Sequence, residues 1–278
     1  MDFPIRFTKM SGTGNDFIII DHRQTFLSKE EMSVFAKSVC RRKFSVGADG
    51  LILIENDENA DFRWQFFNGD GSQAEMCGNG ARCAARFAYA KGIAPANMSF
   101  LTVAGEIRAE VAGEEIKLAM TPPENLVLNR QVELDGSSTI VHSINTGVPH
   151  AVIFVKNNSH TQVKEWGHSI RFHEIYQPAG TNVNFVEVIN ENEIHVRTYE
   201  RGVEDETLAC GTGAVASAII AALQEEVASP VRVTTSGGEI LTIYFRINTQ
   251  IDIEISDVCL EGPAHFIYEG ELQREALI

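Results

Sequence analysis

The stretch EMCGNGARCAARFAYAKG at residues 75–92 returns in the second half of the chain as LACGTGAVASAIIAALQE at residues 208–225. In both copies a cysteine precedes Gly-x-Gly, and alanines follow at the i, i+4 and i+7 spacing that places them on one face of a helix. The repeat therefore predicts two helices, beginning near Asn79 and Thr212, that are central and buried. The matched pairs are Cys77 and Cys210, Gly78 and Gly211, Gly80 and Gly213, Ala81 and Ala214, Ala85 and Ala218, and Ala88 and Ala221.

The likeness continues upstream of the two cysteines. A strand-like segment, 64–67 in one copy and 194–199 in the other, precedes a loop in which residues 68–69 match residues 201–202. Each half then has the same order of strand, loop, cysteine, Gly-x-Gly and buried helix. A cysteine before a glycine is by itself typical of a small buried residue at a turn. The pairing of the whole pattern instead predicts a duplication that gives two pseudo-symmetric halves.

The rest of the chain indicates an α/β (α+β) fold. Ser28–Cys40 is a further predicted helix, because Ser28 can act as N-cap three residues before Glu31. Segments 115–120 and 250–255 alternate apolar and polar residues, as in an antiparallel sheet with one solvated face. The proline-containing segment 121–125 breaks regular structure and is the predicted interdomain linker. Short segments rich in β-branched residues predict strands at 17–20, 51–54, 151–155, 185–189 and 240–245.

The composition is that of a globular protein with two domains. The chain has 278 residues, 44% of them hydrophobic, and no apolar run of 18 residues that could span a bilayer. The N-terminus lacks the apolar segment of a secretory signal, so we expect a cytoplasmic protein without membrane partners. The formal net charge of −15 repels phosphates and no basic run exceeds residues 41–43, which argues against nucleic-acid partners.

The cysteines indicate neither disulfides nor a metal site. There are five, an odd number, and none forms the C-x-x-C pair of a zinc ribbon or a thioredoxin-like motif. Cys83 follows Cys77 by six residues, about 240° further round a helix, so it cannot share a site with Cys77. We expect Cys83, Cys40 and Cys259 to lie in the core.

Cys77 and Cys210 are the candidate catalytic residues. A helix N-terminus carries unpaired N–H groups and about half a positive charge, which lowers the pKa of a thiol placed there. The glycines beside each cysteine leave backbone N–H groups open to a substrate carboxylate. Two thiols on opposite faces of one molecule could remove a proton from a carbon and return one from the far side, which inverts a stereocentre. Such a reaction needs no cofactor.

Three other residues are candidates near these loops. His150 follows a turn and precedes a strand, where a lone histidine is either structural or functional. Glu200 and Arg201 take the second-half position that matches residues 67–68, where a charge pair either tunes the thiols and holds a zwitterion or forms a solvated ion pair. A nucleotide site is not indicated, because segments 12–14 and 211–213 both lack the G-x-G-x-x-G spacing.

Seven segments carry a resemblance to a known family: GTGNDF (12–17), FNGDGS (67–72), MCGNGARC (76–83), GVPH (147–150), NVNF (182–185), ERG (200–202) and LACGTG (208–213). Together they resemble the diaminopimelate epimerases over nearly the whole chain. The resemblance implies cofactor-independent interconversion of LL- and meso-diaminopimelate, in the synthesis of lysine and peptidoglycan precursors.

The resemblance also implies roles for individual residues. Cys77 and Cys210 would be the acid/base pair, with His150 and Glu200 near the thiols and the reacting amino group. The loops after the cysteines would hold the α-carboxylate, and polar side chains would grip the rest of the substrate. The implied substrate-binding residues are Asn15, Asn68, Gly78, Asn79, Asn184, Glu200, Arg201, Gly211 and Thr212.

The family fold implied is two similar halves, each a curved, mostly antiparallel sheet or barrel around a central helix, with the active site between them. The halves would be residues 1–120 completed by a C-terminal strand at 264–278, and residues 121–263. The chain departs from some members at Gly50, where they have glutamine, and at Val148, where they have asparagine. Both departures leave recognition of the distal end of the substrate open.

Several alternatives stay open. Within the fold the nearest is a proline or hydroxyproline racemase, which Arg201 and the asparagines disfavour because they suit a substrate with a second polar end. A non-catalytic amino-acid-binding protein and a redox sensor with a disulfide between Cys77 and Cys210 are alternatives of other classes. The oligomeric state is not determined by the sequence, and a homodimer is kept as a hypothesis.

Overall fold

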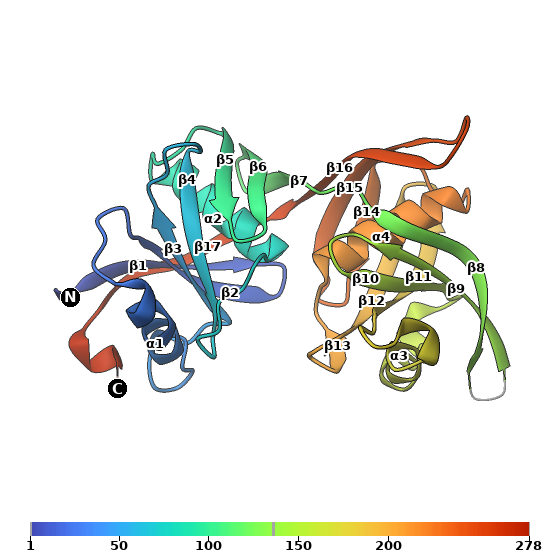
Figure 1. Ribbon diagram of the computed structural model, residues 1–278, viewed down its shortest axis with the longest axis horizontal. Coiled ribbons are helices and arrows are strands. Elements are labelled where there is room, and N and C mark those ends of the chain that lie inside the picture. Colours follow the sequence, from blue (N-terminus) through green and yellow to red (C-terminus); the bar gives the residue numbers. More distant parts are fainter. Residues whose placement is uncertain (1, 135–136, 278) are drawn as a thin grey trace. The chain divides into compact units, whose positions relative to one another are not determined.

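The computed structural model describes residues 2–134 and 137–277. The chain forms two compact units, Met1–Leu118 with Gly262–Ile278, and Ala119–Glu261. Figure 1 shows that each unit is a curved sheet that surrounds one helix, α2 in the first and α4 in the second. Within the described residues, no helix combines the length and the apolar character needed to cross a membrane.

The described residues of the first unit form eight strands in the order β17-β1-β2-β3-β4-β5-β6-β7. Neighbouring strands are antiparallel except for two parallel pairs, β2 with β3 and β4 with β5. A parallel pair needs a crossover, and α1 and α2 supply the two crossovers. The elements are β1 (Ile5–Gly12), β2 (Asn15–Asp21), α1 (Lys29–Val39), β3 (Gly50–Glu55), β4 (Phe62–Asn68), α2 (Gly78–Ala90), β5 (Asn97–Thr102), β6 (Gly105–Ala112), β7 (Glu115–Ala119), β17 (His265–Leu272) and the short 3₁₀ helix η3 (Arg274–Leu277).

Among the described residues of the second unit, eight strands follow the order β8-β9-β10-β11-β12-β14-β15-β16, and a ninth, β13, pairs with β12. Its two parallel pairs are β10 with β11 and β12 with β14, and their crossovers contain α3 and α4. The elements are β8 (Glu124–Leu134), β9 (Ser137–Asn145), β10 (Pro149–Phe154), η1 (Asn158–His160), α3 (Val163–Arg171), η2 (Glu174–Tyr176), β11 (Asn182–Asn190), β12 (Glu193–Glu200), β13 (Asp205–Thr207), α4 (Gly211–Leu223), β14 (Val231–Thr235), β15 (Ile240–Asn248) and β16 (Glu254–Pro263).

The two units have the same topology, element for element. The order of pairing is the same, and the parallel pairs and both crossover helices fall at the same places. The strand at one edge comes from a distant part of the chain in the first unit, where β17 pairs with β1. The second unit adds the short β13, which pairs with β12. The predicted fold class, two similar halves with mostly antiparallel sheets around central helices, is confirmed.

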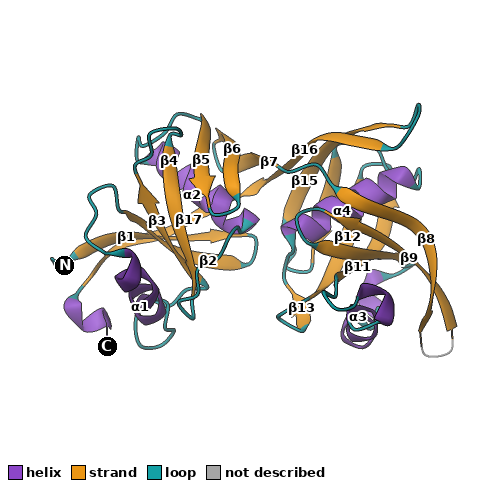
Figure 2. Cartoon of the chain, in the orientation of Figure 1, coloured by secondary structure: helices purple, strands orange, loops and turns teal. Residues whose placement is uncertain are grey.

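The central helices are buried, as the alanine pattern predicts. All six matched alanines are at most 1% exposed, and α4 lies within a core formed by apolar residues of the strands around it. Figure 2 shows both helices enclosed by strands. Small side chains permit this close packing, and a Cβ on Gly80 would lie only 3.3 Å from Ile52 Cδ1. The predicted helix after Ser28 is also confirmed, and the Ser28 backbone N–H donates to Glu31 Oε2 at 2.8 Å.

The structure differs from the sequence-based expectations in three places. Residues 250–253 are not in a strand but in the loop of the β15–β16 hairpin, where Ile251 is 94% exposed. Glu124 and Asn125 do not break regular structure, because they begin β8. Helix α3 was not predicted, because Gly167 within it lowers its helix propensity; its buried face, Val163, Gly167 and Ile170, packs against β11 and β12. A Cβ on Gly167 would lie 2.4 Å from Tyr199 Cβ.

Candidate active site

Cys77 is the N-cap of α2 and has extended backbone angles, φ −148° and ψ 117°. Its carbonyl accepts the first helical hydrogen bond, from Ala81 N at 2.8 Å. The backbone N–H groups of the first turn have no partner within the helix and concentrate positive potential beside the half-buried thiol. A Cβ on Gly78 would have no atom within 4 Å, so the first residue of the helix faces open space.

Cys210 occupies the same place on α4, with φ −129° and ψ 108°. Its carbonyl accepts from Ala214 N at 2.9 Å, and its side chain is also half-buried. The match in sequence is therefore a match in local conformation. Each unit supplies one thiol at the start of its central helix, where the helix dipole favours an anion.

Polar side chains around the start of α2 form one network. Asn79 Nδ2 donates to Asn15 Oδ1 at 2.8 Å, and Asn15 Nδ2 donates to Asp49 Oδ2 at 3.0 Å. Arg82 Nη2 donates both to Asn79 Oδ1 at 2.9 Å and to Thr13 Oγ1. The structure thus brings together two predicted substrate-binding residues, Asn15 and Asn79.

Arg82 is a member of this network that the sequence analysis missed. Its side chain is fully buried, although it carries a permanent positive charge. Its position in a helix that the alanine spacing predicts to be buried could have indicated a buried arginine with polar partners. Asn68 lies at the end of β4, where its Nδ2 donates to Ser72 Oγ at 3.0 Å. The Asn68 side chain bonds within its own turn and not to Asn15 or Asn79.

His150, on β10, is linked to the Cys210 loop. It is 1% exposed, and its Nε2 lies 2.9 Å from Thr212 Oγ1. Thr212 Oγ1 in turn lies 3.5 Å from Cys210 Sγ. Burial, with a smaller contribution from the charge of Arg201, lowers the pKa of His150 to about 3. The imidazole is therefore neutral at neutral pH.

Glu200 and Arg201 lie where β12 turns into β13. Pairing of Thr198 with Thr207 fixes this hairpin, and the chain then leads directly to Cys210. Burial raises the pKa of the Glu200 carboxyl. The Arg201 backbone N–H donates to Asn182 Oδ1 at 2.8 Å. Asn182 is a second residue that sequence reasoning missed, because the segment NVNF offers two asparagines and only the other was chosen.

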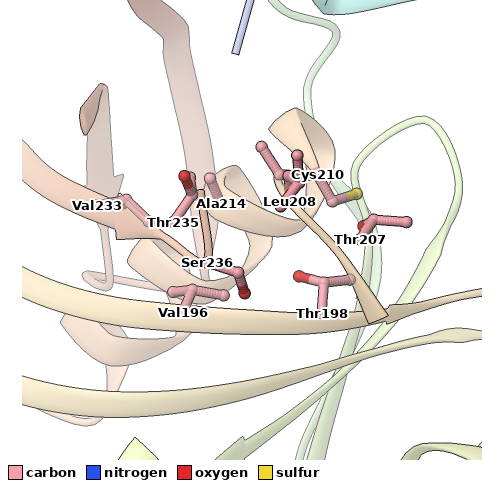
Figure 3. A pocket seen from close by; sticks show the side chains of 10 residues that line it. Val196, Thr198, Thr207, Leu208, Cys210, Ala214, Val233, Thr235 and Ser236 are labelled. Atoms are coloured by element: carbon pink, nitrogen blue, oxygen red, sulfur yellow. The ribbon is translucent and has the colours of Figure 1, made fainter. Parts of the chain in front are cut away.

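A small cavity of about 10 Å³ adjoins Cys210. Figure 3 shows Cys210 and Thr207 at one end of it, with Thr198 and Ser236 also in its wall. This volume suits about one water molecule. The cavity is too small to hold an amino acid.

Comparison with protein families assigns the chain to a family. Residues 7–126 and 142–260 match the sequence model of the family described as Diaminopimelate epimerase. The chain belongs to the diaminopimelate epimerase family. As a member of this family it is an isomerase.

Curated members of the family are similar over almost their entire length. The diaminopimelate epimerase of Aquifex aeolicus is 48% identical, over 98% of this chain and 99% of the relative. That of Chlorobaculum tepidum is 43% identical, over 95% of this chain and 99% of the relative. The chain therefore matches nearly the whole length of these two relatives.

Solved structures share the fold at low sequence identity. A phenazine biosynthesis protein of the PhzF family from Bacillus anthracis has a TM-score of 0.76 and 17% identity, and covers 98% of this chain and 100% of its own. A hydroxyproline epimerase from Agrobacterium vitis has a TM-score of 0.67 and 14% identity, and covers 98% and 93%. These likenesses concern the fold alone.

The structure explains one departure from the diaminopimelate epimerase pattern. Gly50 begins β3 and pairs with Asn68, and a Cβ there would lie 2.6 Å from Phe66 Cε2. Glutamine cannot replace it in this packing. The side chain of Val148 is half-buried, just before β10. Valine has no polar group that could make the hydrogen bonds of an asparagine at this position.

The other cysteines of this family member lie away from the helix starts. Cys83 is fully buried within α2, and burial raises the pKa of Cys40 to about 12, as suits a core thiol. Cys259 is only half-buried on β16, so its predicted place in the core is wrong. Side chains alternate between the two faces of a strand, and the neighbours Val258 and Leu260 point into the core. Cys259 therefore points away from the core.

Proposed function

We propose that this chain is a diaminopimelate epimerase that inverts one α-carbon of LL-2,6-diaminopimelate to give the meso isomer, and the reverse. The observation that carries the proposal is the repeated helix start, with a half-buried cysteine as N-cap in each unit of a chain that belongs to this family. The substrate is a small molecule. No pyridoxal phosphate or other cofactor takes part in the proposed reaction.

In the proposed mechanism the thiolate of one cysteine removes the α-proton. The C–H bond breaks, an S–H bond forms, and the electron pair moves onto the carboxylate oxygens. The thiol of the other cysteine then gives its proton to the opposite face of the carbon, so the configuration is inverted and the thiol/thiolate pair is reversed. Cys77 and Cys210 exchange the acid and base roles in the two directions.

Backbone N–H groups of the two helix starts would stabilise the charge on the carboxylate. Gly78 and Asn79 in one unit, and Gly211 and Thr212 in the other, are the first residues of their helices. Preorganised donors of this kind lower the barrier when charge develops on oxygen in the transition state. The open space at Gly78 supports the approach of a ligand there.

The remaining predicted residues have supporting roles in this proposal. Asn15, Asn68 and Arg201 would bind the polar groups of the substrate, the distal amino-acid end in particular. Glu200, whose pKa burial raises, would lie near the reacting amino group. His150 is neutral and is hydrogen-bonded to Thr212, so it holds the Cys210 loop in place and does not transfer a proton to the substrate.

The proposed reaction has a place in metabolism. It supplies meso-diaminopimelate for lysine and for peptidoglycan precursors, which requires a cytoplasmic enzyme. A homodimer remains part of the proposal and is tested by the molar mass in solution.

The experiment is incubation of the reduced protein with LL-diaminopimelate in heavy water. We expect meso-diaminopimelate with deuterium at one α-carbon, resolved by chiral chromatography and mass spectrometry. Proline and trans-4-hydroxyproline in parallel samples test the racemase alternative. If diaminopimelate neither epimerises nor takes up deuterium, the proposed enzyme activity is refuted. Turnover of proline or hydroxyproline without turnover of diaminopimelate would show that the chain is a racemase of the alternative kind.

A further inference from the structure

The Asn184 side chain is held entirely within the protein. It lies on β11 and is fully buried. Its Nδ2 donates to the carbonyl of Ala151 at 3.0 Å and faces His150 Nδ1 at 3.1 Å, while its Oδ1 accepts from Thr198 Oγ1 at 2.9 Å. A backbone carbonyl only accepts, so the orientation of the amide is settled. Both of its N–H donors are used.

This orientation fixes the tautomer of His150. Since Asn184 donates to Nδ1, that nitrogen must be the acceptor, and the ring proton lies on Nε2. Nε2–H then donates to Thr212 Oγ1 at 2.9 Å. The Thr212 hydroxyl, having accepted this bond, has its own proton available for Cys210 Sγ at 3.5 Å. Asn184, His150, Thr212 and Cys210 form a chain of hydrogen bonds in which each side chain donates to the next.

The first unit has no equivalent of this chain. The pairing of β2 with β3 and of β10 with β11 places Phe17 and Ile52 where the second unit has His150 and Asn184. The glycines agree, because a Cβ on Gly80 would meet Phe17 and Ile52, and a Cβ on Gly213 would meet Asn184 Oδ1 at 2.3 Å. Phenylalanine and isoleucine carry no hydrogen-bond donor.

We propose that Asn184 is a positioning residue that, with Thr198, orients His150 and Thr212 so that the Thr212 hydroxyl donates to Cys210 and favours its thiolate. This inference rests on the proposed role of Cys210 as an acid/base group. It replaces the expectation that Asn184 binds substrate, because the side chain is fully buried and both of its N–H donors are used within the protein. Arg201 is the charged group that acts on His150, and it disfavours the imidazolium further.

The test is the pH dependence of alkylation of Cys210 by iodoacetamide, followed by mass spectrometry of its peptide. Asn184→Asp places an acceptor opposite Nδ1, which draws the ring proton to Nδ1 and turns Nε2 into an acceptor for the Thr212 proton. The donor to Cys210 is then lost, and the midpoint for Cys210 should rise by about one pH unit. Cys77 in the same molecule is the internal control, and its midpoint should stay unchanged. Asn158→Asp, at a buried asparagine that bonds Phe185 O and His195 O, controls for structural damage and should move neither midpoint.

Two further measurements keep the proposal falsifiable if Asn184→Asp fails to fold. Thr212→Val should raise the Cys210 midpoint and Thr212→Ser should restore it. The ¹⁵N shifts of His150 in the wild type should show the proton on Nε2. An unchanged Cys210 midpoint in a folded Asn184→Asp or Thr212→Val variant, or a wild-type ring protonated at Nδ1, would overturn the proposal. None of these measurements requires turnover, so they are independent of the proposed reaction.

Discussion

At the scale of one residue, the burial of His150 makes the stability of the folded protein depend on pH. Its native pKa of about 3 lies below the unfolded value near 6.5, so as the pH falls the unfolded state takes up a proton first. The stability that the neutral ring contributes is complete above pH 6.5 and declines toward pH 3, by at most about 1.4 kcal/mol per pH unit.

His150→Gln removes this titration. Between pH 7 and pH 5 the free energy of unfolding of the wild type should fall by about 2 kcal/mol more than that of the variant. Urea denaturation at several pH values measures the difference. Parallel pH profiles for the two proteins would show that folding does not lower the pKa of His150.

Gly213 provides the second prediction at this scale. A Cβ there would lie 2.3 Å from Asn184 Oδ1, whereas a Cβ on Gly78 would meet no atom within 4 Å. Gly213→Ala should therefore lose about 1–3 kcal/mol of stability through overpacking, and Gly78→Ala, the matched control, should lose none. Equal thermal unfolding of the two variants would mean that the packing around Asn184 is loose.

At the scale of elements, the helices most visible in the sequence are those with local signals. Helices α1, α2 and α4 could be predicted because caps and alanine spacing are read from neighbouring residues. Helix α3 could not, because Gly167 lowers its helix propensity and its support comes from strands. The loop at 250–253 imitates a strand through alternation alone, although only pairing distinguishes a strand from an exposed hairpin loop.

The site divides in the same way. The thiols at the helix starts could be predicted, since each cysteine is adjacent to its own Gly-x-Gly. The bonds from Asn184 to His150 and from His150 to Thr212 could not, because they join β10, β11 and α4 through the pairing of strands far apart in sequence. Arg82 was not predicted because one of its partners, Thr13, lies in a turn that is distant in sequence.

The cap of α1 gives a prediction for an element. Ser28 and Glu31 form a capping box, in which the Ser28 N–H donates to Glu31 Oε2 and the Ser28 hydroxyl accepts from the Glu31 backbone N–H, the bond that alanine would remove. Ser28→Ala should cost about 1 kcal/mol in the free energy of unfolding. Ser38→Ala, inside the same helix, is the control and should have little effect. If chemical denaturation finds the two variants equally stable, the box does not stabilise α1.

For the whole molecule, the two units differ in how the chain completes them. Ala119–Glu261 contains the strands and helices of the second unit without interruption. The first unit instead needs β17, whose Leu272 packs in the same core as Phe7 of β1. Cutting the chain should therefore affect the units differently.

A fragment of residues 119–263 should fold cooperatively by itself, with hydrogen exchange slowest in α4. A fragment of residues 1–118 should not, because β1 keeps β2 but loses its other partner strand, β17, and its apolar side chains lose their cover. Joining residues 262–278 to it through a flexible linker should restore folding. Cooperative thermal unfolding of 1–118 alone would contradict the need for β17.

The most direct test of the two-thiol mechanism is epimerisation by single-cysteine variants. Cys77→Ala and Cys210→Ala should each bind LL-diaminopimelate, remain folded, and form no meso isomer above background, because each direction of the reaction needs both an acid and a base. Cys259→Ala, which removes a thiol on β16 that is not at a helix start, should keep wild-type turnover. Wild-type turnover by Cys210→Ala or by Cys77→Ala would contradict the account.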